Sequence, residues 1–167
     1  MTLARILIVP GGGFTSKEAA LGRLLENRGH TVKFVGKTRG LETSREGEEI
    51  MPDIALYETN PDYFDFAVII GEEMKEVARP EIIRTIRKCV FEKKGAAGIN
   101  KGPVLLAFAG VLNGKRAAVA FSEKSIKFLK DSGAKYAQEE IVTDGNVVTA
   151  AHPEATEDIA AAILKIL

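Results

Sequence analysis

In the first part of the chain, the pattern of apolar and polar residues changes between one typical of a strand and one typical of a helix. Residues 3–9 form a nearly continuous apolar run with one Arg, typical of a strand buried on both faces of a parallel sheet. Residues 15–29 carry apolar side chains at spacings near three and four, and Thr15 and Glu18 stand in capping-box spacing at the start. In residues 31–35, apolar and polar side chains alternate, as in a strand with one buried face. The pattern predicts a strand, a helix and a second strand joined by a right-handed crossover.

The same alternation of short apolar runs and helical patterns continues to the end of the chain. We expect strands over residues 54–57, 66–70, 95–99 and 116–121, helices over 80–94, 101–111, 122–132 and 153–167, and a hairpin of 139–143 with 146–150. Residues 39–62 hold seven carboxylates against two Arg, which predicts an exposed excursion.

This order of elements is typical of a doubly wound α/β fold. We therefore expect residues 1–167 to form one flavodoxin-like domain, a three-layer sandwich with a mostly parallel central sheet and helices on both faces. Ligands in such sheets bind beyond the carboxyl ends of the strands. The ends after Val9, Ile70 and Ile99 are the candidate positions.

Composition and charge narrow the possible partners. The chain has 23 Lys and Arg against 23 Asp and Glu. A net charge near zero argues against bulk affinity for nucleic acid or for an anionic membrane, and it does not oppose self-association, so we expect a homo-oligomer, most simply a dimer. One Cys and two His argue against a disulfide, a metal site or a bound cofactor of the iron–sulfur type. No signal-peptide pattern or apolar run of membrane-spanning length is present, so a cytoplasmic location is expected.

The most informative motif is the hexapeptide Gly-Ile-Asn-Lys-Gly-Pro at 98–103. It stands where a short strand is expected to turn into a helix, in the Gly-x-nucleophile-x-Gly frame of a nucleophile elbow. The central residue of an elbow usually has a positive φ, which Asn tolerates better than most residues. Asn100 can therefore keep the shape of the turn, although its carboxamide is no useful nucleophile. The pattern alone favours a tight turn without further role.

Several stretches in the same order resemble the DJ-1/PfpI family. Residues 95–113, GAAGINKGPVLLAFAGVLN, are similar to the family's elbow, which commonly reads Ile-Cys-His-Gly-Pro and leads to Ala-Gly-Val-Leu. Residues 132–134, 142–149 and 152–153 resemble later family motifs, and 60–65 resemble the lead into its oxyanion loop. The resemblance covers essentially the whole chain.

The resemblance implies that the reactive groups of the family have changed here. The family's nucleophilic Cys falls on Asn100, and the His that often follows it falls on Lys101. The Gly-Gly whose amides help to form an oxyanion pocket falls on Gly71 and Glu72. Without the sulfur, the family's peptidase-like, glyoxalase-like and deglycase-like activities lose their usual route.

The resemblance also concerns the acid that supports the family's Cys. It places that Glu at Thr15, so the acid is missing there, and Glu18 falls on a second acidic position one turn later, where capping the helix is a sufficient role. The ligand pocket implied by the resemblance and the strand ends comprises Gly13, Phe14, Thr15, Gly71, Glu72, Asn100, Lys101 and His152. Within it, Glu72 either places negative charge at the pocket mouth or is merely solvated, and His152 is expected to begin the last helix.

Two further residues have competing interpretations. Cys89 lies within a helical pattern and is expected to be a buried small apolar residue. Lys101 is the best surviving reactive group, since a desolvated Lys amine can attack a carbonyl, but a solvated Lys at a helix start explains it as well.

The segment 11–17, Gly-Gly-Gly-Phe-Thr-Ser-Lys, offers a second candidate site. Backbone amides at a helix start, the helix dipole and Lys17 can hold an anion. The segment is neither a P-loop nor a dinucleotide fingerprint, and the glycines alone suit a tight turn.

Three functions therefore remain open. The first is a catalytically degenerate DJ-1/PfpI-like pseudoenzyme that binds a small polar or anionic metabolite. The second is a hydrolase or carbonyl-adduct enzyme, deglycase-like or glyoxalase-like, that works around Lys101. The third is a nucleotide-binding or anion-binding module at residues 11–17.

Overall fold

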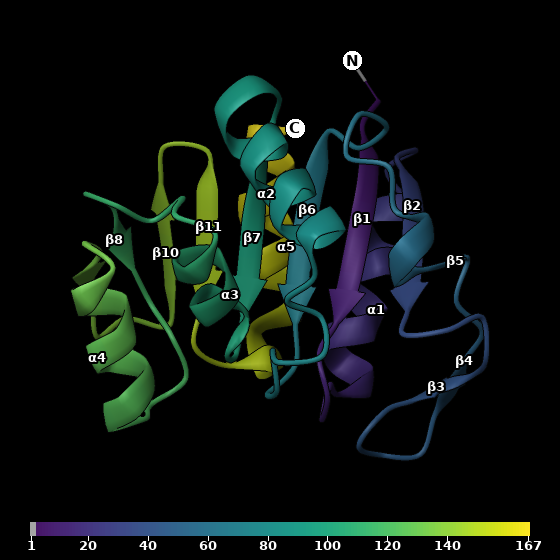
Figure 1. Cartoon of the computed structure of the whole chain (residues 1–167), viewed down its shortest axis with the longest axis horizontal. Coiled ribbons are helices and arrows are strands. Elements are labelled where there is room, and N and C mark those ends of the chain that lie inside the picture. The colour runs from purple at the N-terminus through teal and green to yellow at the C-terminus, as the bar shows by residue number, and fades with distance from the viewer. Residues whose placement is uncertain (1–2) are drawn as a thin grey trace.

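The structure is a computed structural model that describes residues 3–167, and a seven-stranded sheet forms its centre (Figure 1). The strand order is β10-β11-β7-β6-β1-β2-β5, and every neighbouring pair is parallel except the β10–β11 hairpin. The strands are β1 (Arg5–Pro10), β2 (Thr31–Gly36), β5 (Ile54–Ala55), β6 (Phe66–Ile70), β7 (Gly95–Ile99), β10 (Ile141–Asp144) and β11 (Val147–Ala150).

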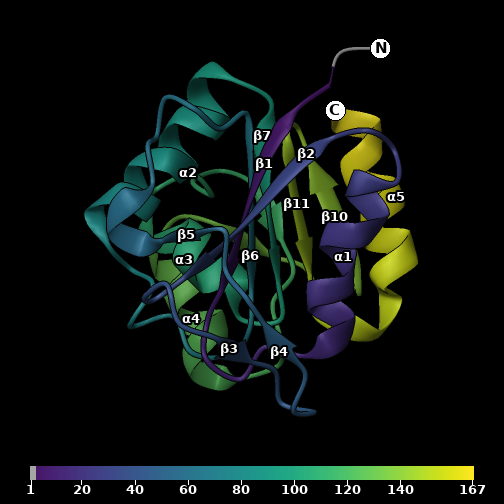
Figure 2. The ribbon, with the colours of Figure 1, turned by 90° about the vertical axis from the view of Figure 1, so that its right-hand side faces the viewer.

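Helices cover both faces of this sheet. Figure 2 shows α1 (Ser16–Glu26) and α5 (Thr156–Ile166) on one face, and α2 (Pro80–Glu92), α3 (Gly102–Phe108) and α4 (Glu123–Asp131) on the other. Residues 3–167 also contain two short 3-10 helices, η1 (Leu56–Glu58) and η2 (Pro153–Ala155). None of the helices within residues 3–167 has the length and apolar character needed to cross a membrane.

The strand pattern explains the three layers. Ile6 and Ile8 pack into the core beneath α1 and α5, whereas Leu7 and Val9 pack into the core on the opposite face. Successive side chains of a strand point to opposite faces, so the continuous apolar run of β1 supplies both cores at once. The flavodoxin-like three-layer fold predicted from the sequence is confirmed.

Several segments differ from the sequence prediction. Residues 54–57 are expected to be a strand, but the strand is confined to β5, and Leu56–Glu58 form η1. Residues 116–121 were expected as one strand, but only β8 (Arg116–Ala117) forms, and it pairs in parallel with β9 (Lys135–Tyr136) outside the main sheet. The strand ends early because the backbone amides that follow it bond elsewhere. Ala118 N donates to Thr149 Oγ1 and Ala120 N donates to Asn100 O, both at 2.9 Å.

The acidic excursion is more ordered than expected. It contains a small antiparallel hairpin of β3 (Glu42–Thr43) and β4 (Glu49–Ile50), hereafter the β3–β4 hairpin. Figure 1 shows this hairpin at the lower edge of the molecule, where β1 and β7 also end. The expected helix over 101–111 is shorter, since α3 ends at Phe108.

Candidate functional site

The elbow predicted at Asn100 is present. β7 ends at Ile99, α3 begins at Gly102, and Asn100 between them has a φ of 65°, the one positive φ among the non-glycine residues described. The residue is only 8% exposed. Its N–H donates to Ala150 O, and its carbonyl accepts from Ala120 N, both at 2.9 Å. A backbone held on two sides can keep a conformation that costs about 1–3 kcal/mol in isolation.

Two glycines allow the tight packing around this turn. A Cβ on Gly102 would lie 2.2 Å from Ile69 O, and a Cβ on Gly98 would lie 2.7 Å from Pro103 N. Real Cβ atoms do not approach backbone atoms so closely, so any larger residue at either position would displace the elbow from β6 or from α3. The Gly-x-x-x-Gly frame is therefore required by the close approach of backbone segments.

Glu18 contributes a buried carboxylate to the base of the site. It forms the predicted capping box, in which Thr15 Oγ1 accepts from Glu18 N at 3.1 Å and Glu18 Oε1 accepts from Thr15 N at 2.9 Å. Its other oxygen, Oε2, accepts from Gly71 N at 2.7 Å, a contact that the sequence did not reveal. The side chain is 1% exposed, and burial raises the pKa of its carboxyl group even though these hydrogen bonds act to lower it. The carboxylate thus ties the start of α1 to the loop after β6.

The loop after β6 is joined in turn to the elbow. Gly71 O accepts from Lys101 N at 3.1 Å, and Glu72 N donates to Gly12 O at 2.9 Å. The two amides that the family resemblance suggests as oxyanion donors, those of Gly71 and Glu72, therefore both have acceptors within the chain. The bond from Lys101 thus joins the residue after Asn100 to the Gly71 loop.

The β3–β4 hairpin lies against the start of α1 and the Gly71 loop. Glu46 Oε1 accepts from Ser16 N at 2.7 Å, and this hydrogen bond lowers the pKa of the Glu46 carboxyl group. Arg45 N donates to Phe14 O at 2.8 Å, and the Arg45 guanidinium forms an ion pair with Glu72. No sequence pattern predicts these contacts, because Glu46 stands in an acidic run without periodicity.

The other predicted pocket residues fall into two groups. Phe14 and Thr15 are buried, and Thr15 shares the capping box with Glu18. Gly13 is exposed and lies close to Glu72, since a Cβ on Gly13 would lie 3.2 Å from Glu72 Oε2. His152 is exposed and precedes η2, as expected for a residue that begins the last helical segment. It lines a neighbouring hollow with Phe121, so its membership of one pocket with Asn100 stays a prediction.

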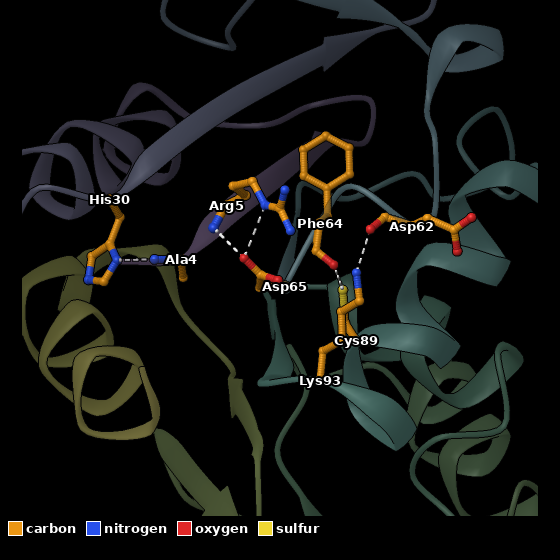
Figure 3. Close-up of polar contacts among 8 residues, drawn as sticks. All are labelled: Ala4, Arg5, His30, Asp62, Phe64, Asp65, Cys89 and Lys93. Atoms are coloured by element: carbon orange, nitrogen blue, oxygen red, sulfur yellow. Dashed lines mark hydrogen bonds and ion pairs between the residues drawn. The ribbon is translucent and has the colours of Figure 1, made fainter. Parts of the chain in front are cut away.

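Cys89 lies in a different part of the molecule, where Figure 3 shows it beneath Phe64. Its Sγ, fully buried, donates to Phe64 O at 3.6 Å, and burial raises the pKa of its thiol to about 12. At neutral pH the group is a thiol and not the thiolate that nucleophilic chemistry requires. The prediction that Cys89 is a buried apolar residue is confirmed.

The same view shows the hydrogen bonds of His30 and of Asp65. His30 is buried and its Nδ1 accepts from Ala4 N at 3.0 Å, and burial lowers the pKa of its imidazole (Figure 3). Asp65 Oδ2 accepts from Arg5 N at 2.8 Å. Within residues 3–167, no three His, Cys, Asp or Glu side chains come together as metal ligands.

Comparison with known proteins decides the family. A model of the DJ-1/PfpI family matches residues 4–166. The chain belongs to the DJ-1/PfpI family. It is 35% identical to a deglycase of Thermococcus kodakarensis over 153 residues, which cover 89% of this chain and 90% of that protein. It is 31% identical to the deglycase PfpI of Pyrococcus furiosus, over 77% of this chain and 78% of the relative.

Solved structures agree with the fold of the DJ-1/PfpI family. A ThiJ/PfpI domain protein from Brachyspira murdochii superposes with a TM-score of 0.84 at 22% identity, over 99% of this chain and 97% of the other. A two-domain protein from Anabaena variabilis, with a DJ-1/ThiJ/PfpI-like and a ferritin-like domain, reaches 0.86 at 23% identity, over 97% of this chain and 47% of the other. DJ-1 of Schizosaccharomyces pombe reaches 0.75 at 19% identity, over 99% and 98%.

Proposed function

We propose that this chain is a binding member of the DJ-1/PfpI family that has lost the family's thiol chemistry. The observation that carries the proposal is Asn100, which occupies the elbow at a φ of 65° where the family places its Cys. A carboxamide does not ionise to a nucleophile near neutral pH. Cys89 offers no replacement, since its thiol is buried and has a pKa of about 12.

The hydrogen bonding around the elbow supports the same proposal. An oxyanion pocket needs N–H groups that point at the reacting oxygen. Here Gly71 N is bonded to Glu18, and Glu72 N is bonded to Gly12 O. A carbonyl substrate would have to displace intramolecular acceptors to reach these amides, so stabilisation of a tetrahedral intermediate is disfavoured.

The groups that remain at the elbow suit recognition of a small polar or anionic metabolite. Asn100 supplies an amide that can donate to a carboxylate, and Lys101 is half-buried at the start of α3 and supplies a positive charge. We propose that these two residues provide the ligand contacts, and that the protein acts as a homodimer.

The start of α1 is a poorer candidate for anion binding. Ser16 N already donates to the Glu46 carboxylate, and Glu18 N and Thr15 N are used in the capping box. An incoming nucleotide phosphate would compete with an internal carboxylate. The anion-binding module at residues 11–17 is therefore not proposed as the function.

One comparison favours a second candidate function. The relatives from Thermococcus kodakarensis and Pyrococcus furiosus are named deglycases, so a carbonyl-adduct activity around Lys101 is the alternative. It requires the Lys101 amine to add to a carbonyl carbon and to form a Schiff base with loss of water. Borohydride reduction in the presence of a ketoaldehyde should then label Lys101 above the other lysines.

Thermal shift and calorimetry with small carboxylates, using lactate and glycolate as probes, test the binding proposal. We expect saturable binding to the wild type, a loss of at least about fivefold in affinity in Lys101→Met, and no loss in Lys124→Met, an exposed Lys of α4. Equal binding by both variants, or borohydride labelling of Lys101 with accompanying turnover, would contradict the proposal.

A further inference from the structure

A separate hollow lies beside the elbow, next to β8 and β11. These two strands lie in the left-hand part of Figure 1. It has a volume of about 190 Å³. Its walls come from the segment after β8, from β9 with the segment that follows it, and from the turn after β11. The lining residues are Val119, Phe121, Tyr136, Gln138, Glu139, Glu140, Ala151 and His152.

The elbow holds two walls of this hollow in place. Asn100 O accepts from Ala120 N, which fixes the segment carrying Phe121, and Asn100 N donates to Ala150 O, which fixes the turn carrying His152. The third wall is tied to the second, because Ala151 N donates to Glu140 O at 2.9 Å. Hydrogen bonds therefore hold the backbone of the hollow in place. The side chains that line the hollow are not those of Asn100 and Lys101.

An unusual aromatic residue lies at the hollow. Phe121 is 75% exposed, the highest fraction among the large apolar side chains described, and Tyr136, which also lines the hollow, is half-buried. Exposure of a Phe ring is unfavourable for the free protein, and a ring face beside a hollow offers a contact to an alkyl group or a cation.

The charged residues at the hollow indicate which charge a ligand would carry. Glu139 and Glu140 are both exposed in its wall, and Arg116 forms an ion pair with Glu139 from outside the lining. That pair leaves Glu140 as the second acidic residue of the lining. Two carboxylates against one cation disfavour an anion and favour a positively charged group.

We propose that this hollow binds a small organic cation, an amine whose ammonium or guanidinium group faces Glu140 and whose hydrocarbon part lies on Phe121. The ligand class is opposite in charge to the one proposed for the elbow, and the proposed contacts, Glu140 and Phe121, differ from Asn100 and Lys101. The two proposals can therefore succeed or fail independently.

An NMR titration of the full chain with n-butylammonium tests this site directly. The neutral n-butanol and the anionic butyrate serve as matched probes, at about 0.1 M salt, where exposed charges are only partly screened. We expect saturable amide shifts around Phe121, Tyr136 and His152 with n-butylammonium, and no saturable shift at these amides with n-butanol or butyrate.

Variants identify the groups responsible. Phe121→Ala and Glu140→Gln should each weaken n-butylammonium binding roughly two- to fivefold, whereas Glu157→Gln, an exposed acid of α5, should leave it unchanged. Both substituted residues are exposed, and unchanged spectral dispersion would verify the fold. Equal shifts with n-butanol, shifts confined to other parts of the chain, or unaltered affinity in both variants would overturn the proposal.

Discussion

Replacement of Glu18 measures how strongly the buried carboxylate holds the site together. In Glu18→Ala, Thr15 N and Gly71 N lose their acceptors, since the carboxylate bonds to one with each oxygen. Hydrogen bonds to a charged group contribute about 1.5–3 kcal/mol each, so the two bonds together amount to roughly 3–6 kcal/mol. The substitution also removes the cost of burying a charged group, which offsets part of the energy lost with the hydrogen bonds. We expect a net loss of about 2–4 kcal/mol in the free energy of unfolding.

Glu18→Gln separates the hydrogen bonds from the charge. Its amide keeps one acceptor but directs an NH₂ group at the second backbone N–H, so we expect a smaller loss of about 1–2 kcal/mol. The loss should also depend on pH. Because burial raises the folded pKa of Glu18 above its ordinary value of 4.5, the folded wild type binds more protons than the unfolded chain between those two pKa values. Its stability falls as pH rises through the folded pKa, so the cost of Glu18→Gln should shrink toward neutral pH.

Urea denaturation followed by far-UV circular dichroism, at several values between about pH 4.5 and 7.5, provides the assay. Glu26→Gln, an exposed carboxylate on the same helix, is the matched control and should change stability by less than about 0.5 kcal/mol at every pH. A loss below about 1 kcal/mol in Glu18→Ala, or a cost of Glu18→Gln that grows toward neutral pH, would refute the reasoning.

Four shorter predictions concern the elbow, the buried His and the two nucleophile candidates. Asn100→Gly should stay within about 1 kcal/mol of wild type, whereas Asn100→Val should lose about 1–3 kcal/mol in urea denaturation; equal stability of the two would mean that φ is not positive there. Since burial lowers the folded pKa of His30 below 6.5, wild-type stability should fall as pH drops below about 6.5, and His30→Asn, which can still accept from Ala4 N, should lack this loss; parallel curves would contradict it. Iodoacetamide should label Asn100→Cys far faster than Cys89 at about pH 8, and similar rates would mean that the elbow does not expose the thiol. Borohydride with methylglyoxal should label Lys101 no more than Lys124, as mass spectrometry of peptides can show.

The sequence predicts most of the fold and the position of the elbow. The continuous apolar run of β1, the capping box of Thr15 and Glu18, and the glycines around Asn100 each have a local physical meaning, and the structure has each of them. The cap at Ser122, whose Oγ accepts from Ser125 N at 3.3 Å, is another feature that local spacing is sufficient to predict.

What the sequence does not predict is which distant groups share a hydrogen bond. The second role of Glu18 depends on Gly71, which is 53 residues away, and no periodicity encodes that contact. The same holds for Glu46 at Ser16 N and for the short β8, whose continuation bonds to Asn100 O in place of a strand. These contacts arise only when the carboxyl ends of the parallel strands meet at one edge of the sheet.

Turnover of a glycated substrate tests the central claim most directly. The assay measures release of free N-acetylarginine from its methylglyoxal adduct by the wild type, with the Thermococcus kodakarensis deglycase as the positive control and Lys101→Met as the variant. We predict no release above buffer from the wild type, because an amide stands at the elbow and the Gly71 and Glu72 amides are already bonded. Wild-type turnover that Lys101→Met abolishes would contradict the loss of catalysis and establish the enzyme alternative.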